Sequence, residues 1–170
     1  MAFTNFLKPR SITQNTGSSE ISWVLDTSVT NEFTGSSSAE PLSSFNAKPT
    51  GLLIFGNYAT STIPATRNDS TPTLINGIEC KIICSKDARI DDSVIQLARS
   101  GSVIGKNKAI TSSGEIHTYG GSTDLWGTTI SQQLDLAGLQ VAVRYKSGSI
   151  PHRDSCYVYS VQLKIHHNYE

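Results

Sequence analysis

The sequence predicts an all-β protein, an antiparallel β-sandwich of jelly-roll type with an extended N-terminal arm. Hydrophobic and polar residues alternate over several short stretches, which is the period of strands that bury one face. Ser, Thr, Asn and Gly are abundant, whereas charged residues make up only 16% of the chain, a composition that favours strands and loops over surface helices. No stretch shows a sustained helical period, so short strands joined by long connections are expected to pack as two sheets.

Residues 1–20 are expected to form the arm rather than a strand. Four residues at its start are predicted to bind a partner: Phe3, Phe6, Leu7 and Pro9. A folded sandwich gains little from apolar side chains at its extreme end, and the polar residues 11–20 would act as a tether that becomes ordered on that partner. The alternative is that this segment pairs as an edge strand of its own domain or of a neighbouring one.

Residues 21–170 are expected to form a single sandwich domain. A short strand is predicted at 21–25, and the Ser-, Thr- and Pro-rich stretch 27–50 is interpreted as a long loop or a set of short edge pieces. The apolar run GLLIFGNY at 51–58 is typical of a strand buried on both faces. A loop is expected at 63–72.

The clearest alternation begins after the turn signal Asn76-Gly77 and predicts four residues on one buried face: Ile78, Cys80, Ile82 and Cys84. In the next strand Ile95 and Leu97 face one way, and a turn at residues 101–102 lets 102–104 pair back. A short strand is expected at 114–119. Residues 131–137 are predicted to form one helical turn.

The last two strands have the strongest alternation. In GLQVAVRYK the inward residues are Leu139, Val141, Val143 and Tyr145. In SCYVYSVQLKIHH they are Tyr157, Tyr159, Val161, Leu163 and Ile165. A loop with Gly148 and Pro151 joins these strands, so an antiparallel pair is expected. The predicted core contains Ile78, Ile82, Leu97, Val141, Val143, Tyr159, Val161 and Leu163.

Five pieces carry a family likeness: INGIECKI, DDSVIQLARSGSVIGKNKA, TYGGSTDLWGTTI, LDLAGLQVAVRY and YVYSVQLKI. In this order they resemble a β-sandwich domain that recurs in virion proteins of tailed bacteriophages, and TYGGSTDLWG is the most specific of them. The likeness covers residues 75–169. It implies a structural protein of a phage particle, and members of this kind occur in tail fibres, baseplates and capsid decorations.

A short, self-contained chain favours a capsid decoration (cement) protein that binds the major capsid protein. The alternative is a receptor- or carbohydrate-binding module of a tail fibre or baseplate. A homotrimer is expected, because a surface of low charge associates readily and decoration proteins often occupy threefold positions of a capsid lattice. The expected location is the virion, after synthesis in the host cytoplasm.

Charge and hydropathy exclude several partners. The 14 basic and 14 acidic residues balance, which argues against nucleic acid as the main partner, since its phosphates call for a basic face. No run of about 18 apolar residues could span a membrane, and the N-terminus lacks the apolar stretch of a signal peptide.

No catalytic, cofactor or metal site is predicted. A Gly-x-Ser-x-Gly elbow, a phosphate-binding loop and a dinucleotide fingerprint are all absent from the sequence. His166 and His167 are adjacent and would point to opposite faces of a strand, while His117 and His152 lie in loops. Three carboxylates could hold calcium, although a solvated turn with a local ion pair is the simpler interpretation: Asp87, Asp91 and Asp92.

Two further sets of side chains have structural and functional interpretations. Four aromatic residues could stack on a sugar if exposed, or fill the core: Trp23, Trp126, Tyr119 and Tyr58. Three cysteines are predicted to be free thiols: Cys80, Cys84 and Cys156. Cys80 and Cys84 are four residues apart on one strand, about 13 Å, whereas a disulfide needs Cα atoms within about 7 Å.

Overall fold

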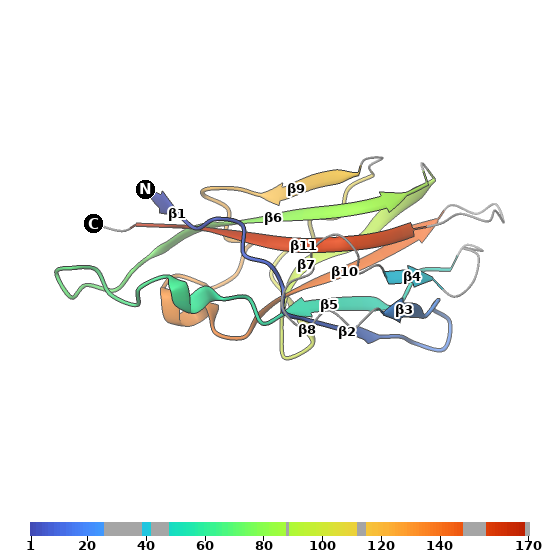
Figure 1. Cartoon of the computed structure of the whole chain (residues 1–170), viewed down its shortest axis with the longest axis horizontal. Helices are drawn as coiled ribbons and strands as arrows, with labels where there is room; N and C mark the ends of the chain where they lie inside the picture. The colour runs from blue at the N-terminus through green and yellow to red at the C-terminus, as the bar shows by residue number, and fades with distance from the viewer. Residues whose placement is uncertain (26–38, 42–47, 88, 112–114, 148–155, 169–170) are drawn as a thin grey trace.

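The computed structural model of the chain describes residues 1–25, 39–41, 48–87, 89–111, 115–147 and 156–168. Within these ranges the chain consists mainly of strands, which form two antiparallel sheets packed face to face (Figure 1). The predicted all-β sandwich is therefore confirmed. The helical segments described are single 3-10 turns, η1 (Thr60–Thr62) and η2 (Gln133–Leu136). The second lies within the stretch predicted to form a helical turn.

The first sheet, sheet A, has a long central strand with different neighbours along its length. Its spatial order is β3 (Trp23–Leu25), β4 (Ala39–Pro41), β11 (Cys156–His167), β6 (Ile75–Lys86) and β9 (Ile116–Gly120). β1 (Ala2–Phe3) pairs with the end of β11. β11 therefore has β6 along one edge, and on the other edge it has β4 near its start and β1 at its end.

The second sheet, sheet B, covers the opposite side of the core. Its spatial order is β2 (Ser11–Asn15), β5 (Leu52–Gly56), β10 (Leu139–Ser147), β7 (Ile90–Arg99) and β8 (Ser102–Ile104). The expected apolar strand within 51–58 is β5, and Leu53, Ile54 and Phe55 are all buried, as predicted for a strand covered on both faces.

Seven of the eight residues predicted for the core are at most 1% exposed: Ile78, Ile82, Leu97, Val141, Val143, Val161 and Leu163. Tyr159 was wrongly placed with them. The register of β11 against β6 shifts between Val158 and Ser160, so a bulge changes which residues face inward. Val158 is buried in place of Tyr157 and Tyr159, which are partly exposed and stack with ring centroids 6.3 Å apart.

The predicted pairing of the last two strands is wrong. β10 pairs with β5 and β7 in sheet B, whereas β11 pairs with β6 in sheet A. Two consecutive strands with one apolar face each can lie side by side in one sheet or face each other across the core. The alternation is the same in both arrangements, so it could not distinguish them.

The N-terminal segment is part of the sandwich. Ser11–Asn15 pairs along its whole length with β5, and Phe3 pairs with His166 of β11. Between them Leu7 forms a bridge with Leu163. The prediction of an unpaired arm is therefore wrong for these residues, and the edge-strand alternative describes them. Polar side chains suit an edge strand that faces solvent on one side.

Candidate functional site

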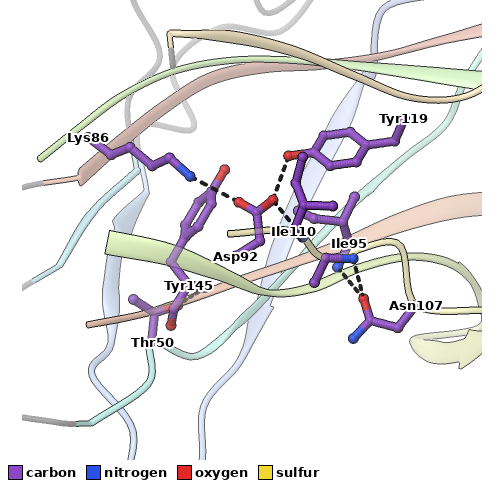
Figure 2. Close-up of polar contacts among 9 residues, drawn as sticks. Thr50, Lys86, Asp92, Ile95, Asn107, Ile110, Tyr119 and Tyr145 are labelled. Carbon is purple, nitrogen blue, oxygen red and sulfur yellow. Dashed lines mark hydrogen bonds and ion pairs between the residues drawn. The ribbon is translucent and has the colours of Figure 1, made fainter. Parts of the chain in front are cut away.

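A buried ion pair joins the two sheets at one end of the sandwich (Figure 2). Lys86 Nζ lies 3.0 Å from Asp92 Oδ1, and the two side chains are 2% and 1% exposed. Lys86 is the last residue of β6 in sheet A, and Asp92 lies on β7 in sheet B. The Tyr119 hydroxyl donates a 2.6 Å hydrogen bond to Asp92 Oδ2. The buried carboxylate therefore has a charged partner on one oxygen and a hydroxyl donor on the other.

The loop after β8 completes this arrangement. Asn107 fastens the loop to β7, since its side-chain oxygen accepts from the Ile95 N–H at 2.9 Å and its amide donates to the Ser93 carbonyl. The Ile110 N–H then donates to Asp92 Oδ2 at 3.3 Å (Figure 2). With these bonds, a carboxylate that would be costly to bury alone is satisfied from several directions.

The Lys86 ammonium also lies 5.0 Å from the centre of the Tyr145 ring. The electron-rich face of an aromatic ring attracts a cation at this position. We call Lys86, Asp92, Tyr119 and Tyr145 the interior cluster. Burial, together with the hydrogen bond to Asp92, raises the pKa of Tyr119, and burial raises that of Tyr145. The phenols therefore stay protonated into the alkaline range. The interior cluster is buried and paired within the chain, and its contacts connect sheet A with sheet B.

This geometry separates the carboxylates considered for calcium. Asp92 points into the core towards Lys86, whereas Asp91 is the cross-strand neighbour of Lys146 and Asp87 is exposed. Adjacent residues of a strand face opposite sides, so Asp91 and Asp92 cannot share one ion. Within the described ranges, no group of three His, Cys, Asp or Glu side chains could hold a metal ion.

The histidines lie in different environments. His166 Nε2 is 2.9 Å from Glu79 Oε2, and its ring is 6.0 Å from that of Phe3. His167 lines a pocket beside the N-terminal segment, where burial lowers its pKa. His117 is on β9 rather than in a loop, with its ring 5.8 Å from that of Tyr119. His152 lies outside the described residues.

The motif TYGGSTDLWG has a structural role. Trp126 is fully buried, and its indole N–H donates to the Ile78 carbonyl at 2.8 Å. Gly120 has φ +78°, and a Cβ there would lie 2.2 Å from the Ile78 oxygen and 2.6 Å from Trp126 Nε1. Asp124 accepts from the Trp126 N–H and from Lys108 Nζ. The motif therefore closes the edge of sheet A around one large side chain, for which glycine is required.

The four aromatic residues considered for sugar binding are all buried. Trp23 and Trp126 are at most 2% exposed, and Tyr58 and Tyr119 are at most 8% exposed. The Tyr58 hydroxyl donates to the Val161 carbonyl at 2.6 Å, and the Trp23 indole N–H donates to the Gly51 carbonyl at 2.8 Å. The core interpretation is correct for all four, so they provide no sugar-binding platform.

The three cysteines are free and buried, in agreement with the prediction. Burial is the main cause that raises the pKa of Cys80, Cys84 and Cys156. Thiols with a raised pKa are poor nucleophiles, since the thiolate is the reactive form.

The two aromatic residues predicted to bind a partner, the exposed Phe3 and the partly buried Phe6, lie on the outer face of sheet A. Phe3 pairs with His166, and Lys164 is two residues earlier on β11, so these side chains share one face. Lys164 Nζ lies 4.4 Å from the centre of the Phe3 ring and 5.5 Å from that of Phe6. Lys81 Nζ lies 4.2 Å from the Phe6 ring. We call Phe3, Phe6, Lys81 and Lys164 the surface cluster.

The other two residues of the predicted arm site face inward. Leu7 bridges to Leu163 and packs against the core, and Pro9 is buried. Phe3, by contrast, is 61% exposed. The structure thus divides the four predicted residues into two that attach the segment and two that face outward.

A pocket of about 470 Å³ adjoins the surface cluster and shares Phe3 with it. Its walls come from the N-terminal segment and from the chain around η1: Phe3, Leu7, Ile63 and Pro64, with the polar side chains of Asn5 and Thr62. No pattern in the sequence indicates this pocket, because its walls come from three segments that are far apart along the chain. Its lining is suited to binding an apolar group rather than to chemical reaction.

Comparisons with known protein families, with curated proteins and with solved structures found no match. In the part of the chain that the structure describes, no helix is long and apolar enough to cross a membrane.

Proposed function

We propose that the chain is a structural protein of a tailed-bacteriophage particle, bound to the capsid surface as a decoration protein. The proposal rests on the sequence likeness in residues 75–169 and on one observation of the structure. Phe3 is held by strand pairing at its backbone, yet its ring is 61% exposed. Fixed aromatic side chains on a surface are common anchors of protein interfaces, because little conformational entropy is lost when they bind.

The outer face of sheet A offers further area for such an interface. It carries the surface cluster, the stacked pair Tyr157 and Tyr159, and the 62% exposed Ile116 of β9. The capsid lattice would supply many copies of the same binding surface. A trimer on threefold positions would bind through three such faces together, so that modest affinity at each would still give stable attachment.

Immunogold labelling tests the proposal. Antibodies against the recombinant protein are applied to purified particles produced from the genome that carries this gene. Gold distributed over the capsid shell supports a decoration protein. Gold at the tail would contradict the capsid location and support the alternative, a tail-fibre or baseplate protein. Purified particles that carry no gold and no detectable copy of the chain would overturn the virion role.

The oligomeric state is measured independently by light scattering. The proposal expects a mass three times the 18.4 kDa of one chain. A monomer mass at micromolar concentration would contradict the trimer and leave the particle-binding proposal to the labelling experiment.

A further inference from the structure

We propose that the surface cluster and the adjoining pocket form one docking site for an acidic protein segment. A carboxylate of that segment would lie between Lys81 and Lys164, and an apolar side chain would enter the pocket beside Phe3. The inference rests on the proposed function, since the segment would belong to another protein of the particle.

The first argument is the charge of the surface cluster. Lys81 and Lys164 come from neighbouring strands, and both ammonium groups approach the same ring, that of Phe6. Neither forms an ion pair with the described residues. The cross-strand neighbour of Lys164 is Glu79, and its carboxylate contacts His166 instead. Two ammonium groups close to one ring, beside a glutamate that contacts His166 rather than either lysine, favour an anionic partner.

The second argument is the apolar half of the site. The pocket lies within the usual size range of binding pockets, roughly 300–1,000 Å³, and Phe3, Leu7, Ile63 and Pro64 contribute its apolar walls. Asn5 and Thr62 give it a polar rim. An apolar side chain flanked by a carboxylate matches both halves, and a protein segment supplies the two groups together.

The ring contacts favour a protein over a sugar or a nucleic acid. Sugars and bases bind aromatic residues by stacking on a ring face. Lys164 lies over the Phe3 ring, and both lysines lie close to the Phe6 ring. One side of each ring therefore already contacts a cation, and the same ammonium groups can bind a carboxylate.

The test uses particles of a phage from which the gene for this protein has been deleted. Purified protein is added to these particles, and the amount that sediments with them is measured. The double variant Lys81→Glu/Lys164→Glu reverses both charges and is expected to bind about tenfold or more weakly at low salt. Wild-type binding should weaken as salt increases, and the variant should lose much of this dependence. The matched control Lys48→Glu/Lys106→Glu reverses two exposed charges elsewhere and should bind like the wild type.

The pocket is tested separately with Asn5→Trp, which fills it from an exposed position, and with Asn68→Trp as a control on another exposed loop. Only Asn5→Trp is expected to weaken binding. Each variant is first checked for an unchanged unfolding midpoint, so that a loss of binding is not a loss of fold.

The outcomes separate the two proposals. If the wild-type protein does not bind particles of the phage that lacks the gene, the proposed function is wrong. If the wild type binds and the lysine variant binds equally well, the docking site is wrong while the proposed function stands. If the lysine variant loses binding and Asn5→Trp does not, the site recognises only an anion, such as a charged polysaccharide. That result would contradict the proposal that the ligand is a protein segment.

Discussion

Two lysine–aromatic clusters in this molecule use the same kinds of side chain in opposite environments. In the interior cluster, Lys86 lies over the Tyr145 ring and contacts Asp92 at 3.0 Å, with both charges buried. In the surface cluster, Lys81 lies over the Phe6 ring at 4.2 Å, and it forms no ion pair with the described residues.

The difference lies in what completes each cluster. The interior carboxylate is held by Lys86, the Tyr119 hydroxyl and the Ile110 N–H, so the interior cluster is complete within one chain. The surface cluster has cations and apolar rings, and no carboxylate among the described residues forms an ion pair with either lysine. A cluster that is satisfied internally serves stability, and one that is left open is available for a partner. The predictions below separate these two roles.

The largest effect is expected from breaking the buried pair. Lys86→Met leaves Asp92 charged and without its cation in the core, which should lower the free energy of unfolding by about 3–5 kcal/mol. The double variant Lys86→Met/Asp92→Leu removes both charges and should be less destabilised than Lys86→Met alone. Urea unfolding of both variants measures this. A single variant within about 1 kcal/mol of the wild type would contradict the role of the pair.

A smaller loss is expected from Tyr119→Phe. This change removes the hydroxyl that donates to Asp92 and leaves the ring in place, so the expected loss is about 1.5–3 kcal/mol, the usual contribution of a hydrogen bond to a charged group. Tyr159→Phe on the outer face of sheet A, where the ring is partly exposed, is the matched control, and its unfolding free energy should change little.

Alkaline pH should weaken the core through its thiols. The unfolded Cys80 thiol loses its proton above about pH 8.5, whereas burial raises its folded pKa and keeps it protonated. Its contribution is fully present below that pH and is lost as the pH rises. Between pH 9 and 10 the unfolding free energy of the wild type should therefore fall more steeply than that of Cys80→Ala, by about 1.4 kcal/mol per pH unit. Equal slopes would indicate an accessible thiol.

The smallest effect on stability is expected at the surface cluster. Phe3→Ser and Lys81→Glu change side chains that face outward, so each should alter the unfolding free energy by only about 0.5 kcal/mol. A loss several times larger for either variant would show that the surface cluster serves folding, and it would remove the contrast with the interior cluster.

The sequence contained much of the fold and part of the interior cluster. The alternation Ile78, Cys80, Ile82 and Cys84 correctly gave the buried face of β6, and continued by two residues it also places Lys86 inward. Asp92 follows Ile90 in the same way, and both are buried. The predicted inward residues Ile95 and Leu97, continued back along β7, would place Asp91 inward, so the alternation indicated only the lysine of the buried pair. The register shift between Val94 and Asp92 brings Asp92 to the core instead.

Other features depend on contacts that alternation does not encode. The bulge near Tyr159 arises from the register of β11 against β6. The one extra residue in β11 exchanges the side chains that face the core with those that face solvent. The pairing of Ser11–Asn15 depends on the free edge of β5 rather than on its own polar composition. The surface cluster combines the N-terminal segment with β6 and β11, which only the folded chain brings together.

Lysine acetylation, read by peptide mass spectrometry on free and particle-bound protein, tests the contrast between the two clusters most directly. Lys86 should stay unmodified in both states, because it is buried and paired. Lys81 and Lys164 should react in the free protein and become protected on the particle, while the exposed Lys48 and Lys106 react in both. Equal modification of Lys81 and Lys164 in both states, or ready modification of Lys86 in the folded free protein, would contradict the account.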